Sequence, residues 1–184
     1  TAVRGALPHE PRPVLRASLT ARICVCGQAP GTRVHASGKP FTDPSGDRLR
    51  TWMGVTPEEF YDEQRIAIIP MGFCFPGQDV RGADLPPRSE CAATWHDALF
   101  AALPSFALVL LVGQYAHQWH LKERAKASLT ATVANWQEYI SDVSAPRYLP
   151  LPHPSWRNNA WLKHNPWFDE KVVPYLRSEI RRLL

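Results

Sequence analysis

Three short segments hold the residues whose types and spacing suggest chemistry. Residues 27–31 (Gly-Gln-Ala-Pro-Gly) directly follow an apolar run, and residues 153–158 (His-Pro-Ser-Trp-Arg-Asn) follow another one about 120 residues later. Between them, residues 38–43 place a phenylalanine two positions before a carboxylate. Open α/β sheets bind ligands where loops leave the carboxyl ends of the strands. The spacing therefore predicts one site at such an edge, built from Gly/Pro-stiffened loops.

In this order the two loops resemble the signature loops of the uracil-DNA glycosylase superfamily, which excises deaminated bases from DNA. Residues 38–41 look like the Gly-(Arg/Lys)-Pro-Phe segment that follows the first motif in its fourth and fifth families. Residues 153–158 are most similar to the second motif of the single-strand-selective monofunctional uracil glycosylases. The resemblance implies a monofunctional hydrolase of base excision repair that cleaves the N-glycosidic bond of uracil, with DNA containing deaminated bases as its partner.

Such an enzyme extrudes the base into a pocket and stabilises a sugar cation and a departing base anion. A carboxylate, a hydrogen-bond donor, an aromatic face and a rigid wedge meet these needs. The resemblance implies catalytic roles for Asp43 and His153. It implies base binding by Gln28, Ala29 and Phe41, and DNA binding by Pro154, Ser155, Trp156, Arg157 and Asn158.

Two carboxylates compete for the role of the catalytic acid. The first family carries its acid inside the first loop, where this chain has Ala29, and residues 32–35 contain no acid either. Asp43 matches the acid of the fifth family with one residue fewer in between. Asp47 is the alternative. An acid at a predicted helix start more often has a structural role, because its negative charge interacts favourably with the positive end of the helix dipole.

The expected reader of the base is missing. Relatives end the second strand with an asparagine that recognises uracil, whereas this chain has Ile-Pro-Met-Gly at residues 69–72. Losing a bidentate reader removes about 1–3 kcal/mol of discrimination. We therefore expect a broadened base range that includes hypoxanthine and xanthine, with main-chain amides around Met71 and Phe73 supplying part of the recognition.

Cysteine spacing argues against a cofactor. Cys74 and Cys91 fall where the later two ligands of the fourth-family iron–sulfur cluster would be, but the upstream Cys-x-x-Cys is absent, and such a cluster needs four thiolates. We predict neither metal nor organic cofactor. Cys24 and Cys26 share one face of a predicted strand, so we expect buried free thiols in a reducing, cytoplasmic setting.

Hydrophobic patterning and Gly/Pro breaks predict a single domain over residues 1–184, with an N-terminal arm at 1–21 that has room for a short helix. Its fold class is α/β, a three-layer α/β/α sandwich around a central four-stranded parallel sheet. The predicted strands are 22–28, 66–70, 106–112 and 148–151. The predicted helices are 45–54, 56–64, 89–103, 114–122, 129–139 and one after Pro166 that Pro174 bends; residues 32–44 and 71–87 are predicted loops.

Composition is compatible with a nucleic-acid partner without demanding one. The chain of 184 residues has a net charge of +4, a sequence pI near 9.0, seven Trp and 18 Pro, and rigid aromatic loops suit base stacking. No apolar run reaches the roughly 20 residues of a membrane span, and we expect a monomer. Two other functions remain open: a non-catalytic DNA- or damage-binding homologue, and an enzyme acting on free nucleotides, which the lack of a Gly-rich Lys-Ser/Thr loop disfavours.

Overall fold

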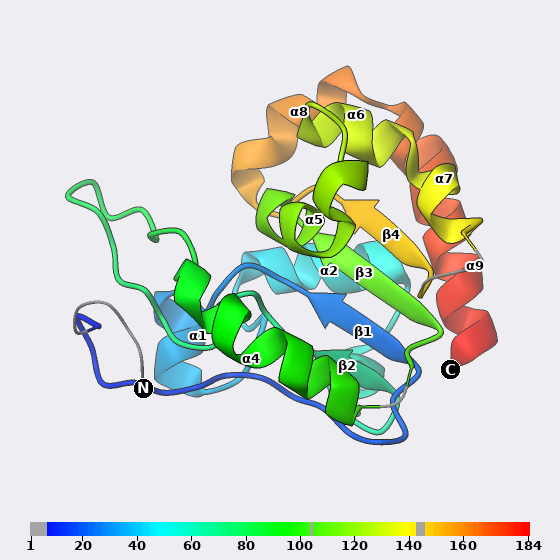
Figure 1. The fold of residues 1–184 in the computed structure, drawn as a ribbon. Coiled ribbons are helices and arrows are strands. Elements are labelled where there is room, and N and C mark those ends of the chain that lie inside the picture. Colours follow the sequence, from blue (N-terminus) through cyan, green and yellow to red (C-terminus); the bar gives the residue numbers. More distant parts are fainter. Residues whose placement is uncertain (1–6, 104, 143–145) are drawn as a thin grey trace.

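The computed structural model describes residues 7–103, 105–142 and 146–184, and it confirms the three-layer α/β/α architecture (Figure 1). The four strands are β1 (Ile23–Cys26), β2 (Ile66–Ile68), β3 (Leu108–Val112) and β4 (Tyr148–Leu151). They form one sheet in the order β2-β1-β3-β4, and every pairing is parallel. Each strand lies within its predicted range, because buried strands read as short apolar runs.

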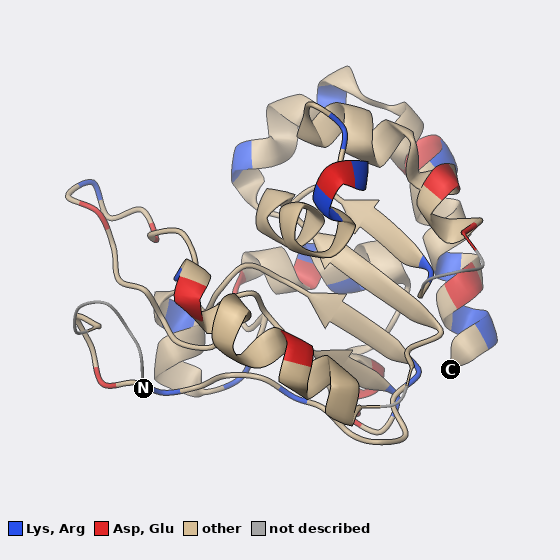
Figure 2. Cartoon of the chain, viewed as in Figure 1, with Lys and Arg blue, Asp and Glu red and all other residues tan. Residues whose placement is uncertain are grey.

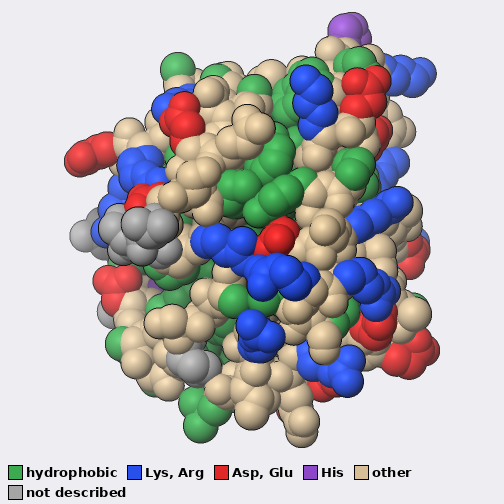
Figure 3. Space-filling model, turned by 90° about the vertical axis from the view of Figure 1, so that its right-hand side faces the viewer, with side chains coloured by type: hydrophobic (Ala, Val, Ile, Leu, Met, Phe, Trp, Pro, Cys, Tyr) green, Lys and Arg blue, Asp and Glu red, His purple; other side chains and the backbone are tan. Residues whose placement is uncertain are grey.

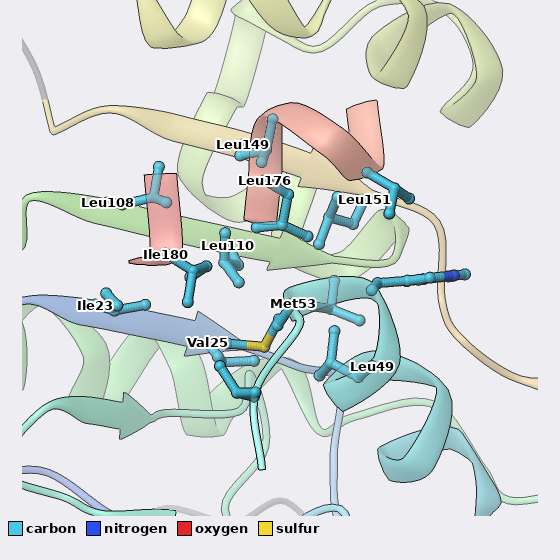
Figure 4. Close-up of a cluster of buried hydrophobic side chains, with 14 of the residues drawn as sticks. Ile23, Val25, Leu49, Met53, Leu108, Leu110, Leu149, Leu151, Leu176 and Ile180 are labelled. Atoms are coloured by element: carbon cyan, nitrogen blue, oxygen red, sulfur yellow. The ribbon is translucent and has the colours of Figure 1, made fainter. Parts of the chain in front are cut away.

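Alternate residues of the strands build two cores. One face of the sheet presents side chains such as Ile23 and Leu110 to α2 (Pro44–Met53) and α9 (Val173–Leu183), which contribute Met53 and Ile180 among others (Figure 4). The other face presents Cys24 and its neighbours to α4 (Ser89–Ala102) and α5 (Gln114–Leu121). Burial on both sides leaves the strand ends as the place where polar side chains gather.

The remaining helices are short. They are α1 (Thr32–Ser37), α3 (Pro57–Tyr61), α6 (Leu129–Ala134), α7 (Trp136–Ile140), α8 (Asn159–His164), three-residue 3₁₀ turns at Lys122–Arg124 and Trp156–Asn158, and a π-helical turn at Phe168–Val172. The predicted capping box is present: Thr56 accepts from the amide of Glu59, whose carboxylate accepts from the amide of Thr56. None of the helices in the described ranges is both long and apolar enough to cross a bilayer.

Two predictions about local structure were wrong. Residues 32–37 form α1 rather than a loop; only Val34 of this helix is buried, so it has no apolar periodicity to detect. The single helix expected at 129–139 is broken at Asn135. The helix expected after Pro166 consists of the π-helical turn followed by α9, and Pro174 lies directly after that turn, in the first turn of α9.

The described part of the arm, residues 7–22, contains no helix and runs along the outer edge of the sheet. Arg16 exchanges two main-chain hydrogen bonds with Ile68 of β2, of 2.9 and 2.7 Å, in an antiparallel bridge. Two residues before Arg16, the amide of Val14 donates to the carbonyl of Phe73 at 2.7 Å. The arm thus anchors the loop that follows β2. At the opposite edge, β4 contains Pro150.

Charged residues of both signs are spread over the molecule (Figure 2). On the side that carries α7 and α9, Lys and Arg gather among Asp and Glu (Figure 3). Ion pairs neutralise much of this group: Glu179 accepts from Arg147 at 2.7 Å and from Arg182 at 2.8 Å. The strand arrows of Figure 1 point away from this side, so it lies opposite the edge where a ligand site is expected.

Two buried histidines make the fold sensitive to acid. His96 is 1% exposed, and its Nε2 donates to the carbonyl of Pro70 at 2.9 Å; burial lowers its pKa from 6.5 to about 4. His117, equally buried, has its pKa lowered to about 4 for the same reason. At acid pH the unfolded chain binds protons on these histidines that the folded chain does not. The contribution of the two histidines to the free energy of unfolding is therefore complete above pH 6.5 and is lost as the pH falls toward 4.

We therefore expect the free energy of unfolding to decrease between pH 6.5 and pH 4 by up to about 3 kcal/mol through His96 alone. His96→Gln keeps a side-chain donor for Pro70 but has no titrating ring, so its stability should depend less steeply on pH. Urea denaturation across this pH series measures both slopes. Equal slopes for the two proteins would show that His96 binds its proton equally in the folded and unfolded states, and therefore does not cause the pH dependence.

Candidate active site

A cavity of about 660 Å³ opens at the carboxyl ends of the strands. Its wall includes Gly27 after β1, Pro70 after β2 and His153 after β4. Most of the residues predicted from the sequence line it together: Gln28, Ala29, Phe41, Asp43, His153, Pro154, Ser155, Trp156, Arg157 and Asn158. Met71 and Phe73 do not; their side chains belong to the core beneath α4 and α5. The structure thus brings together loops that are far apart in the sequence.

Phe41 forms an aromatic wall against the first loop. Its backbone has φ of +55°, an uncommon conformation for a bulky residue. The tip of its ring lies 3.0 Å from the place where a Cβ on Gly27 would be, so only glycine allows the ring to lie so close. Its carbonyl accepts from the hydroxyl of Tyr61 at 3.0 Å and from Arg50 at 3.2 Å. These contacts hold the strained backbone and fix the ring.

Asp43 is the N-cap of α2. Its Oδ1 accepts from the hydroxyl of Ser45 at 2.7 Å and from the amide of Gly46 at 3.4 Å. Within the described residues, Oδ2 has no donor, and Asp43 lines the cavity. Asp47 differs on every count: its side chain is 79% exposed, pairs with Arg50 at 2.6 Å, and lies outside this cavity. Placement thus favours Asp43 over Asp47 as the acid at this site.

The environment of His153 fixes its tautomer. The amide of Ser155 donates to Nδ1 of His153 at 3.2 Å, so a neutral ring carries its proton on Nε2. Burial lowers the pKa of His153 below its ordinary value, and the negative charge of nearby Asp43 only partly opposes this shift. His153 is therefore a neutral hydrogen-bond donor at neutral pH, and it lies within electrostatic range of Asp43.

The second loop is tied to α2 and presents one large side chain to solvent. Nη1 of Arg48 donates to the carbonyl of Ser155 at 3.1 Å, and Nδ2 of Asn158 donates to the carbonyl of His153 at 2.7 Å. These bonds hold the loop closed around His153. Trp156 remains 72% exposed beside Arg157, so its ring is available to a partner at the mouth of the cavity.

The ends of β3 and β4 support both loops from below. Gly113 follows β3 with φ of +87°, and a Cβ there would lie 2.8 Å from Nε2 of Gln28 and 3.5 Å from Cβ of His153. Nε2 of His117 lies 3.0 Å from the carbonyl of Leu111 and 3.1 Å from that of Leu151. Because both partners are acceptors, this nitrogen carries the proton and joins the two strand ends.

The main-chain amides expected to read the base are not free. The amide of Met71 donates to the carbonyl of Gly27 at 2.9 Å, and the amide of Gly72 donates to that of Gln28 at 2.8 Å. The amide of Phe73 donates to Sγ of Cys91 at 3.3 Å. The prediction that the amides around Met71 and Phe73 replace the missing asparagine was therefore wrong. The amides of Met71 and Gly72 hold the first loop in place, and the amide of Phe73 is bound to α4.

The cysteines lie apart from the cavity wall. Cys24 and Cys26 are fully buried free thiols whose sulfurs lie 3.7 Å apart, as the shared strand face predicted. Cys74 and Cys91 are free thiols close enough for their charges to interact, and burial raises the pKa of both.

Sequence reasoning missed several residues that line the cavity, among them two on α2 and two in the loop after β2. Ser45 and Arg48 project from the first turns of α2, and Gln78 and Asp84 belong to the loop between β2 and α4. The position of Asp43 at a helix start is a signal for the first two, since residues just after an N-cap lie beside it. Nothing in the sequence places the long loop against residues 27–31.

The family described as the uracil DNA glycosylase superfamily matches residues 16–177, which cover both signature loops and all four strands.

The role of Asp43 as a helix N-cap can be tested by unfolding measurements, which do not depend on any catalytic role of its carboxylate. Asp43→Ala should lower the free energy of unfolding by about 1 kcal/mol, because the amide of Gly46 loses its acceptor. Asp43→Asn should change it by less than about 0.5 kcal/mol, since asparagine caps helices as well as aspartate does. Urea denaturation at pH 7 measures both; equal destabilisation of the two variants would contradict the capping role.

Proposed function

The chain belongs to the uracil DNA glycosylase superfamily, and on that premise we propose that it is a monofunctional DNA glycosylase that releases uracil and other deaminated bases. The observation that carries this proposal is the meeting of Asp43 and His153 in one cavity, each within electrostatic range of the other. Hydrolysis of an N-glycosidic bond separates charge into a sugar cation and a base anion. A carboxylate and a donor on the same wall match those two charges.

Asp43 stabilises the sugar and orients water in this mechanism. One of its oxygens is committed to Ser45 and Gly46, which holds the carboxylate in a single orientation. The other oxygen is free, among the described residues, to accept a hydrogen bond from water. Its negative charge favours the oxocarbenium-like transition state, and water then attacks the anomeric carbon.

His153 stabilises the leaving base. A neutral imidazole with its proton on Nε2 donates to the oxygen on which the negative charge develops, with no proton transfer required. Burial favours this form by lowering the pKa of His153. The ring of Phe41 offers a flat surface for stacking the extruded base.

The second loop is proposed to contact DNA. Trp156 is exposed and held on a rigid turn, so it suits the gap that an extruded base leaves in the stack. Arg157 and Arg48, both in the cavity wall, favour phosphate contacts. We propose that a single copy of the chain acts, and that the reaction needs neither metal nor organic cofactor.

The base range is proposed to extend to hypoxanthine and xanthine. Residues 69–73, directly after β2, have no side-chain amide, and the main-chain amides of Met71, Gly72 and Phe73 are committed to internal bonds. The same absence favours the second candidate, a homologue that binds damaged DNA without cleaving it. The position of Asp43 beside His153 favours the enzyme.

Base release separates these candidates. Labelled oligonucleotides carrying uracil, hypoxanthine or xanthine, single- and double-stranded, are incubated with protein and cleaved with alkali. We expect release by the wild type and a loss of about a hundredfold or more in Asp43→Asn, with DNA binding retained.

Asp47→Asn serves as the matched control and should remain as active as the wild type. A collapse in Asp47→Asn instead of Asp43→Asn would move the acid to Asp47. Binding without release from any substrate would favour the non-catalytic homologue.

His153→Ala tests the stabilisation of the leaving base. Uracil release should fall by about a hundredfold, and the defect should be smaller on 5-fluorouracil, whose anion is intrinsically more stable. The defect of Asp43→Asn should not shrink in this way, because that carboxylate acts on the sugar. Single-turnover rates for both variants on both bases provide the comparison. An equal defect of His153→Ala on both bases would indicate that His153 only positions the substrate.

A further inference from the structure

The loop between β2 and α4 forms a small hairpin that projects from the body of the molecule (Figure 1), and residues of this hairpin line the cavity. The amide of Leu85 donates to the carbonyl of Gly77 at 2.9 Å, and the amide of Asp79 donates to that of Ala83 at 2.8 Å. Gln78 and Asp84 pair between these bonds in an antiparallel bridge. The hairpin is thus held by its own main chain.

This hairpin carries acidic as well as basic residues toward the proposed DNA-binding edge (Figure 2). A carboxylate near DNA repels phosphate and so requires an explanation. Asp79 is explained by a structural role within the hairpin, because its Oδ1 accepts from the amides of Arg81 and Ala83 at 2.8 and 2.9 Å. Asp84 accepts no main-chain amide of the turn within the described residues; its Oδ1 bonds to Gln78 across the hairpin, and Asp84 lines the cavity.

Gln78 holds one oxygen of the Asp84 carboxylate, and the other oxygen lies against the first signature loop. Nε2 of Gln78 donates to Oδ1 of Asp84 at 3.2 Å. Oδ2 of Asp84 lies 2.6 Å from the position that a Cβ on Gly31 would occupy, so a side chain at residue 31 would push the carboxylate aside. Gly31 is the last residue of the first signature loop, and the absence of a side chain there leaves room for the carboxylate beside the base-binding wall.

We propose that Asp84 is a specificity-determining residue that accepts a hydrogen bond from the ring N–H of the extruded base. This inference rests on the proposed function and names the group that reads the base in place of the missing amide. Deamination converts a ring nitrogen with a lone pair, in cytosine or adenine, into an N–H donor beside a new carbonyl, in uracil or hypoxanthine. A carboxylate attracts the second kind of ring edge and repels the first.

The same chemistry explains a range that covers both pyrimidines and purines. Uracil, hypoxanthine and xanthine share a ring N–H next to a carbonyl, whereas their ring sizes differ. A single acceptor on a hairpin recognises that shared feature without a pocket shaped for one ring.

Asp84→Asn tests the proposal. Single-turnover release is measured on oligonucleotides with uracil, hypoxanthine or cytosine at the target position. We expect roughly a 10- to 100-fold loss on uracil and hypoxanthine, the effect of removing a hydrogen bond to a charged group, and a smaller preference over cytosine. Asp97→Asn, which makes the same charge change on the exposed surface of α4 outside the cavity, should stay within about twofold of the wild type.

Gly31→Ala moves the carboxylate without removing it. The backbone φ of Gly31 is −86°, which is compatible with alanine, but the new methyl group would displace the side chain of Asp84. The variant should reproduce the loss of base preference of Asp84→Asn and add little to it in the double variant.

Binding gives a readout that does not depend on catalysis. In an Asp43→Asn background, adding Asp84→Asn should reduce the difference in affinity between uracil- and cytosine-containing DNA. An active wild type combined with unchanged rates and preference in Asp84→Asn would overturn the role of Asp84 alone. A wild type that releases no base would overturn the proposed function itself.

Discussion

The carbonyl oxygen of Phe41 is the contact on which the geometry of the site depends. Tyr61 and Arg50 both donate to it, and a side chain on Gly46 would collide with it, at 1.9 Å from the Cβ position. These constraints hold Phe41 at positive φ. Its ring is thereby pressed against the first loop, and Asp43, two residues later, reaches the start of α2 at the orientation required of an N-cap. One strained residue thus positions the aromatic wall and the carboxylate together.

The cavity combines two electrostatic environments that serve different charges. Asp43 lies in the cavity wall at the start of α2, where its Oδ1 accepts from the amide of Gly46. His153 lies half-buried near Gly113 and the end of β4, where desolvation lowers its pKa and favours the neutral ring. The protein therefore holds a charged group and an uncharged donor within one small space, which is the asymmetry that a reaction with separating charges needs.

Sequence reasoning could find the residues with strong local signals. Parallel strands reveal themselves as short apolar runs, and the two loops keep Gly and Pro where sharp turns require them, so the sheet and most of the cavity wall were predictable. The role of Asp43 as N-cap and the broken helix at Asn135 depend on exact boundaries, which local patterns define poorly. Asp84 and the committed amides of Met71 and Phe73 depend on contacts between distant segments. No spacing rule connects residue 84 to Gly31, since only the folded hairpin brings them together.

The two edges of the sheet explain how the protein avoids a common hazard of β-structure. An unpaired edge strand offers its main chain to any other extended segment and so invites aggregation or strand exchange. Here the arm occupies the outer side of β2 through the paired bonds of Arg16 and Ile68. On the other side, Pro150 gives β4 a position that has no hydrogen to donate to an incoming strand. Both features make the edges of the sheet poor templates for pairing with a further strand.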